Sequence, residues 1–187
     1  MQTTIVQQAA GNGGPFEASA SGRAVDVTEF VLPDEPAASY VARVTAEKAS
    51  TAWRMSLLRN LPERPVLAAD TTVVLHGRIY GKPGNRDEAY AMLSALSGQT
   101  HQVLTSIAVH YHDRHWQCTQ ISEVTFCPLN ARQINDYCDS AEPYDKAGGY
   151  GIQGAAARFI SHIAGSYSGI MGLPLFETAQ LLSEVEL

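Results

Sequence analysis

Apolar residues recur every three or four positions in several stretches of this chain, which is the spacing of helices that bury one face. The predicted helices begin near Ser39, Asn85, Asn130 and Pro174. Ser39 stands where a helix cap belongs, and the helix after it is expected to run toward Leu57. Asn85 and Glu88 have the spacing of a capped helix start, and Gly98 fits the left-handed residue that ends such a helix.

Other stretches are continuously apolar or alternate every second position, which predicts strands. The segment PVLAADTTVVL predicts a buried strand that ends at Asp70 or bends past it. From His101 to about Phe126 the period is two, and Asp113–Arg114 can form the turn of an antiparallel pair. The segments RIY and RFISHIAG predict two further strands. Because helices and strands are interspersed, we expect an α/β fold with a mixed central sheet.

Composition narrows the classes of protein that this chain can belong to. It has 187 residues, 45% of them apolar, and a net charge of −6. An acidic protein is poorly suited to a nucleic-acid polymer or an anionic membrane, although a few local cations or a metal can still hold a small anion. No apolar run approaches the roughly 18 residues of a membrane span, and the first residues lack the features of a secretion signal. Three cysteines without a C-x-x-C pair indicate reduced thiols, so we expect a cytoplasmic protein.

Several polar residues are candidates for chemistry, each with a structural alternative. Asp70, followed by two threonines, can hold a metal or a water near a strand end, or it can cap a turn. Lys48, Lys82 and Lys146 can bind an anion or can be solvated. Lys146 precedes the loop GGYGIQG, whose backbone N–H groups can cradle an anion but which lacks the strand–turn–helix context of a known phosphate motif.

Three histidines near the expected hairpin tip also invite a metal hypothesis. We expect His110, His112 and His115 to point to different faces, and no second cluster completes a set of ligands. The sequence therefore does not predict a zinc site.

Four segments, in this order and spacing, resemble the Maf family of nucleoside triphosphate pyrophosphatases. They are AADTTVV, GKP, LSGQTHQVLTSIAV, and EPYDKAGGYGIQGAAARFI with the later GSYSGIMGLPL. The resemblance covers about residues 36–185 and treats 1–187 as a single Maf-like domain with an atypical segment over 1–33. It implies a fold similar to that of inosine triphosphatases, in which a mixed sheet divides two lobes around a nucleotide-binding cleft.

The same resemblance implies a reaction. Members of the family hydrolyse a nucleoside triphosphate to the monophosphate and pyrophosphate with the help of Mg²⁺ or Mn²⁺. The DKAG-x-YGIQG signature is similar to that of the branch acting on dTTP and UTP, and modified pyrimidine nucleotides are further candidate substrates. Asp70 matches the family's proton acceptor and is also a candidate metal ligand. Glu29 corresponds to a family acidic residue and is included among the substrate-binding candidates.

The other substrate-binding candidates carry over position by position. Lys48 in AEKA and Lys82 in GKP match the family's two phosphate-site lysines. Thr71 and Gln153 match positions linked to base selection, and the Gln153 amide offers a donor and an acceptor to the O4 and N3–H edge of uracil or thymine. Lys146 lies in the signature loop itself.

The N-terminal part departs from the family pattern. Members have a strand, an S-x-S-P-R-R loop and an apolar helix ahead of a Phe-Glu strand. Here Pro15–Glu17 can match that later strand, which leaves the loop absent or replaced, and Ser19–Arg23 echoes it without the second arginine. Losing two arginines would remove charge-assisted phosphate contacts. This departure keeps open an alternative: a catalytically impaired Maf-like nucleotide-binding or interaction protein linked to cell-division control. A homodimer is also open, because family members are often dimers.

Overall fold

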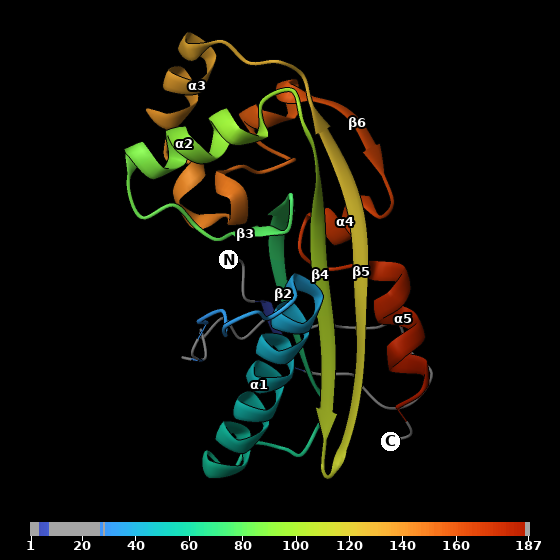
Figure 1. Ribbon diagram of the computed structural model, residues 1–187. Helices are drawn as coiled ribbons and strands as arrows, with labels where there is room; N and C mark the ends of the chain where they lie inside the picture. The colour runs from blue at the N-terminus through green and yellow to red at the C-terminus, as the bar shows by residue number, and fades with distance from the viewer. Residues whose placement is uncertain (1–3, 8–26, 28, 186–187) are drawn as a thin grey trace. The chain divides into compact units, whose positions relative to one another are not determined.

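The computed structural model describes residues 4–7, 27 and 29–185 (Figure 1). Its strands are β1 (Thr4–Gln7), β2 (Val66–Leu75), β3 (Arg78–Tyr80), β4 (Thr100–Tyr111), β5 (Arg114–Phe126) and β6 (Ile160–Ala164). Its α-helices are α1 (Ala37–Leu58), α2 (Arg86–Leu96), α3 (Ala131–Cys138), α4 (Tyr167–Ile170) and α5 (Leu175–Ser183). Three short 3₁₀ helices are η1 (Pro143–Asp145), η2 (Ala147–Gly149) and η3 (Ala155–Phe159). None of the helices in these ranges has the length and apolar character that crossing a bilayer requires.

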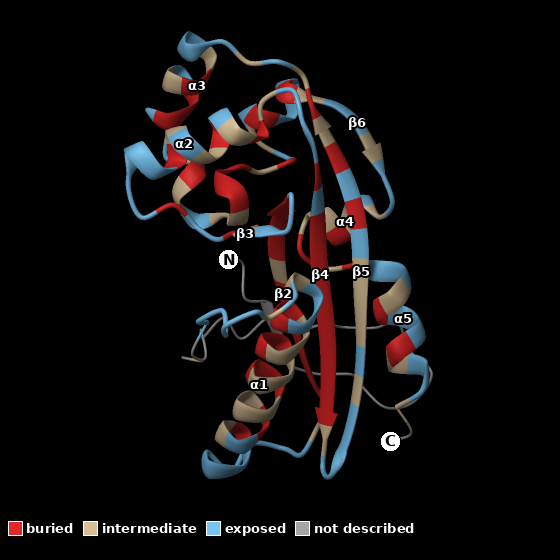
Figure 2. Cartoon of the chain, viewed as in Figure 1, coloured by how far each residue is buried: buried red, intermediate tan, exposed pale blue. Residues whose placement is uncertain are grey.

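The strands form one sheet, which confirms the predicted α/β class with a central sheet. Their order is β1-β2-β4-β5-β6, and β3 pairs with β2. The pairs β1–β2, β2–β3 and β5–β6 are antiparallel. The strand β2 therefore has neighbours on both of its edges, and its residues are buried along nearly its whole length (Figure 2).

The strand β2 runs without a break through Asp70, so the expectation that it ends or bends there is wrong. Five more residues follow Asp70 in the strand, and Thr71 is the single one of the ten that is not fully buried. The β-branched run after Asp70 favours extended backbone. The carboxylate pairs with the Lys48 ammonium in the interior, so it does not need to be at a solvated turn.

Three expected boundaries are also corrected. The first helix begins at Ala37 after Pro36, not after Ser39, because the proline ring fixes a φ of −60° that suits a helix start. The hairpin turn lies at His112–Asp113, one residue earlier than expected, and His112 supplies its positive φ of 54°. The strand β6 begins only at Ile160, because η3 turns Phe159 into the core.

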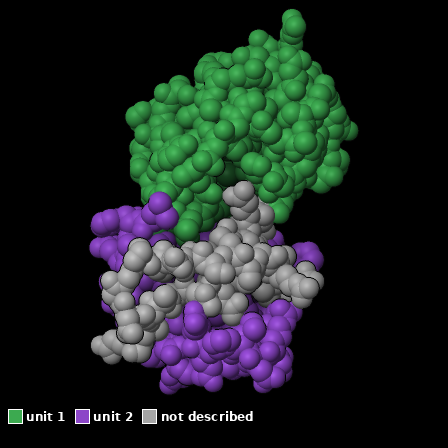
Figure 3. Space-filling model, turned by 180° about the vertical axis from the view of Figure 1, so that it is seen from behind, with its two compact units in different colours: residues 1–2, 71–105, 120–174 green, residues 3–70, 106–119, 175–187 purple. Residues whose placement is uncertain are grey.

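The chain divides into two compact units (Figure 3). Unit 1 comprises residues 1–2, 71–105 and 120–174, and unit 2 comprises residues 3–70, 106–119 and 175–187. In unit 1, α2 and α3 pack on each other and cover a core that includes Leu93, Phe126 and Phe159. In unit 2, α1 lies against the sheet through small residues, which let a helix approach closely; they are Ala49, Ala68 and Ala108.

Gly148 fixes the loop of η2 against β2, and replacing it should be costly. Its φ is 70°, its N–H donates to the Gly81 carbonyl at 2.9 Å, and an added Cβ would lie 3.0 Å from the Val73 side chain. We expect Gly148→Ala to lower the free energy of unfolding by more than about 2 kcal/mol, because backbone strain and a core clash add. Urea denaturation measures this loss.

Gly77 is the matched control for that variant. Its φ is 78°, but an added Cβ would meet nothing within 4 Å. Gly77→Ala should therefore lose only about 1–2 kcal/mol, the cost of left-handed backbone alone. Equal losses in the two variants would show that the contact with Val73 is not what makes Gly148 necessary.

Candidate functional site

Three of the predicted site residues meet in unit 2. The Lys48 ammonium, projecting from α1, lies 2.8 Å from Asp70 Oδ1 in β2 and 2.6 Å from Glu29 Oε1. The side chains of Lys48 and Asp70 are fully buried, whereas that of Glu29 is 35% exposed. An ion pair that is removed from water needs good geometry and further polar contacts to offset the cost of desolvation. The Lys48 ammonium has two carboxylates at short distance, which meets this requirement.

The segment that carries Glu29 is held by two side chains on the first turns of α1. The Tyr40 hydroxyl donates to the Glu29 carbonyl at 3.2 Å, and burial, helped by the negative charges of Asp70 and Glu29, raises the pKa of Tyr40 to about 12. Arg43 donates to the Phe30 carbonyl and to both oxygens of Glu35, and its hydrogen bond lowers the pKa of Glu35 to about 2. The tyrosine thus remains a donor, and Glu29 is placed by α1.

The donors of this cluster fit a hard divalent cation. Glu29 and Asp70 supply carboxylate oxygens, and with Lys48 the three side chains carry one net negative charge. Among the described residues no group of three or more His, Cys, Asp or Glu side chains comes together as a metal cage. Mg²⁺ commonly binds through one or two carboxylates and completes its shell with water and substrate phosphates. The residues present suit that mode of binding.

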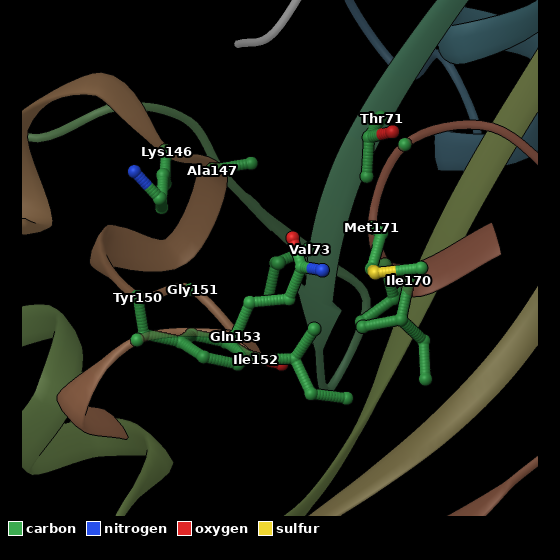
Figure 4. Close-up of a pocket in the computed structure, with 13 residues that line it drawn as sticks. Thr71, Val73, Lys146, Ala147, Tyr150, Gly151, Ile152, Gln153, Ile170 and Met171 are labelled. Atoms are coloured by element: carbon green, nitrogen blue, oxygen red, sulfur yellow. The ribbon is translucent and has the colours of Figure 1, made fainter. Parts of the chain in front are cut away.

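A second group of predicted residues lines a pocket within unit 1 (Figure 4). Its cavity measures about 100 Å³. Its walls come from β2, β4, the loop that includes η2, and the end of α4 with the segment after it; they are Thr71, Val73, Val103, Lys146, Ala147, Tyr150, Gly151, Ile152, Gln153, Gly154, Ile170, Met171 and Gly172. The structure therefore brings together Thr71, Lys146 and Gln153. Figure 4 shows the Gln153 amide reaching into the pocket in front of β2.

The pocket loop owes its shape to a glycine and a carboxylate. A Cβ on Gly151 would lie 2.7 Å from Cε of Lys146, so the missing side chain lets the lysine stem pass along the backbone. The Lys146 ammonium pairs with Asp145. Both carboxylate oxygens of Glu142 accept from the Ala155 N–H, at 3.1 and 2.9 Å, and so cap η3 directly after the segment that carries Gln153. Glu142 had no marker in the sequence beyond its place in the signature.

Behind the pocket lies a buried histidine that sequence reasoning did not single out. His101 Nε2 and the Tyr150 hydroxyl are 2.7 Å apart, and both rings pack edge-to-face on Phe126. Burial lowers the pKa of His101 to about 4. Its neighbours in the strand, Thr100 and Gln102, are also polar, so the local sequence held no signal that marked His101.

His101 should make folding stability depend on pH. Below its unfolded pKa of 6.5 the unfolded chain binds a proton that the folded chain refuses until about pH 4, so stability falls as the pH falls through this window. Between pH 7 and pH 5 we expect His101 to account for about 2 kcal/mol of lost unfolding free energy. Urea denaturation at both pH values, compared with His101→Gln, isolates this contribution. Parallel losses in the two proteins would contradict it.

Lys82 belongs neither to the cluster of Lys48, Asp70 and Glu29 nor to the lining of the pocket. It is exposed in the loop after β3 and is not among the residues that line the pocket. The carbonyl of its neighbour Gly81 accepts from the Gly148 N–H, which connects this loop to the loop of Lys146. Its role as a phosphate ligand stays a prediction.

One residue of each group lies next to the other in the sequence: Asp70 pairs with Lys48, and Thr71 lines the pocket. Asp70 and Thr71 are consecutive in β2, so the pleat directs their side chains to opposite faces of the strand. The segments Pro15–Glu17 and Ser19–Arg23, where the sequence departs from the family pattern, lie outside the described residues.

The histidines of the hairpin differ from the expectation that they point to different faces. His110 and His115 stand opposite each other across the two-residue turn, and their ring centroids are 4.1 Å apart. Trp53 stacks on His110 and meets His112 edge-on. His110 and His112 therefore contact Trp53 of α1, His115 contacts His110, and all of these rings are part of the packing of unit 2.

Comparison with known proteins identifies clear relatives. A family model described as "Maf-like protein" matches residues 6–185. A dTTP/UTP pyrophosphatase of Bordetella avium is 54% identical over 150 residues, which are 80% of this chain and 75% of the relative. Enzymes of the same name from Chromobacterium violaceum and Aromatoleum aromaticum are 50% and 51% identical, over 85% and 89% of this chain and 80% and 81% of their own lengths.

Proposed function

Because this chain belongs to the Maf family, we propose that it hydrolyses dTTP and UTP to the nucleoside monophosphate and pyrophosphate. The observation that carries the proposal is identity of about half to several dTTP/UTP pyrophosphatases across most of the chain. Two features of the geometry support it: a buried carboxylate paired with a lysine, and a small pocket whose walls include Thr71 and Gln153.

In the proposed reaction Asp70 accepts a proton. A water oxygen bonds to the α-phosphorus, the bond from that phosphorus to the bridging oxygen breaks, and pyrophosphate leaves with the electron pair. The proton of the water passes to a carboxylate oxygen of Asp70. Lys48 holds this carboxylate at 2.8 Å, which fixes the position of the base and supplies the positive charge that a buried carboxylate needs.

Glu29 and Asp70 would hold the divalent cation, Mg²⁺ or Mn²⁺. When bound, such a cation supplies neutralisation of the charge on the phosphate oxygens. Lys82 and Lys146 are the residues of unit 1 proposed to bind the phosphates. They lie on two loops that are connected by the hydrogen bond from the Gly148 N–H to the Gly81 carbonyl. Compact ammonium groups suit the several oxygens of a pyrophosphate leaving group.

The pocket is proposed to take the base. Its cavity of about 100 Å³ is below the 300–1,000 Å³ typical of sites for drug-sized ligands, so it suits one ring rather than a whole nucleotide. Apolar side chains can face the plane of the ring; they are Val73, Ile152, Ile170 and Met171. The polar edge of the ring then meets Gln153 and Thr71.

Pyrophosphate release from a panel of nucleotides, with Mg²⁺ or Mn²⁺ and after chelation of the metal, tests the proposal. We expect turnover of dTTP and UTP, weaker turnover of CTP and the purine nucleotides, and loss of turnover on chelation. Calorimetric titration with the same nucleotides identifies the alternative. Tight binding without pyrophosphate release would overturn the enzymatic function and support an impaired, nucleotide-binding member of the family.

A further inference from the structure

We propose that Thr105 is a specificity-determining residue that acts through Thr71 and selects uracil and thymine over cytosine. This inference rests on the proposed function, because it assumes that the pocket of unit 1 takes the base. Thr105 lies on β4, is fully buried and is not among the residues that line the pocket. It is thus a positioning residue, and its effect on a ligand must pass through a neighbour.

A short chain of hydrogen bonds links Thr105 to the pocket. The oxygens of the Thr71 and Thr105 hydroxyls are 2.8 Å apart, and the Thr105 hydroxyl donates to the Gly169 carbonyl at 2.7 Å. All three residues belong to unit 1. Both distances are typical of well-formed O–H···O bonds.

The direction of the first bond follows from counting protons. A threonine hydroxyl has one proton and two lone pairs. The single proton of Thr105 is committed to Gly169, whose carbonyl can only accept. The proton shared between the two threonines must therefore come from Thr71, which donates to Thr105. Toward a ligand, the Thr71 oxygen is left as an acceptor and not as a donor.

The Thr71 oxygen lies beside Gly172, and both residues line the pocket. In Figure 4 it is turned toward the segment that carries Met171. A Cβ added to Gly172, which also lines the pocket, would lie 3.6 Å from this oxygen. The missing side chain of Gly172 thus leaves room beside the acceptor for a ligand N–H.

This fixed polarity distinguishes the pyrimidine bases. N3 of uracil and thymine carries a hydrogen, whereas N3 of cytosine presents a lone pair at neutral pH. The Thr71 oxygen, fixed as an acceptor, can take the N3–H of uracil or thymine. Toward cytosine it faces the N3 lone pair, so both acceptors are left without a hydrogen-bond donor. Gln153 cannot make this distinction alone, because an amide group can turn over and present either its N–H donors or its oxygen to the base.

The test is Thr105→Val, which removes the hydroxyl and keeps the shape. The Thr71 proton is then released, Thr71 can donate to cytosine N3, and the preference for UTP over CTP in kcat/KM should fall about tenfold, the factor that one hydrogen bond supplies. Thr105→Ser retains the hydroxyl and should retain the preference. Thr105→Cys, whose sulfur is only a weak acceptor for the Thr71 proton, should shift it in the same direction as valine and serves if the valine variant folds poorly.

A double variant separates this role from a loss of packing. If Thr105 acts through the Thr71 hydroxyl and not through its bond to Gly169, adding Thr105→Val to Thr71→Val should leave the UTP to CTP ratio of the Thr71 variant unchanged. An unchanged preference in both the valine and the cysteine variants at position 105 would overturn the inference, even while dTTP and UTP hydrolysis by the unsubstituted protein upheld the proposed function. Absence of any turnover in the unsubstituted protein would instead remove the proposed function.

Discussion

Asp70→Asn is expected to reduce the turnover of dTTP and UTP by a factor of about 10² to 10⁴, the usual contribution of a general base. An amide cannot take the proton of the attacking water. The asparagine side-chain oxygen can still accept from the Lys48 ammonium, which lies 2.8 Å from Asp70 Oδ1, so the buried contact persists. Initial rates of pyrophosphate release measure the loss, and calorimetric titration should show that nucleotides still bind.

Asp139→Asn is the matched control for this variant. Asp139 pairs with Arg86 at 2.7 Å but lies exposed on the surface of unit 1, outside the pocket. Removing its charge should leave the rate of hydrolysis within about twofold of the unsubstituted protein, because an exposed ion pair contributes little to folding stability and Asp139 has no part in the proposed reaction. Wild-type-like turnover by Asp70→Asn would remove Asp70 from the mechanism and leave only the positioning of phosphates by cations.

The elements whose ends were predicted best are those fixed by neighbours in sequence. The helix α2 begins where the Asn85 side chain accepts from the Glu88 N–H, and α3 begins at Asn130 with a full capping box. A cap joins residues three positions apart, so its signal lies wholly within a short segment. The course of β2 through Asp70 depends instead on Lys48, 22 residues away, and no local pattern reveals such a partner.

The candidate site shows the same division. Family-like segments indicated Asp70, Lys48 and Gln153, but not that Asp70 and Thr71 belong to different groups of contacts on the two faces of one strand. Thr105 lies within a predicted strand, where a threonine is an ordinary β-branched residue. Only its partners in space, Thr71 and Gly169, give its hydroxyl a role.

Lys48→Met should be the most destabilising of the substitutions considered, with a loss of about 3–5 kcal/mol in unfolding free energy. Lys48 and Asp70 have no exposed side-chain surface, so methionine would leave the Asp70 carboxylate buried without the ammonium at 2.8 Å. Urea denaturation at pH 7 measures the loss. Lys146→Met is the control, because the pair of Lys146 with Asp145 is partly solvated and should contribute at most about 1 kcal/mol.

The cause of that loss can be separated from packing by combining substitutions. If the buried charge is what destabilises Lys48→Met, then adding Asp70→Asn removes it, and the double variant should regain most of the lost stability. Glu29 does not carry the same penalty, because its side chain is 35% exposed and water can reach it once the ammonium is gone. A double variant as unstable as Lys48→Met would show instead that the packing of the lysine stem under α1, rather than the charge at its end, is what unit 2 requires.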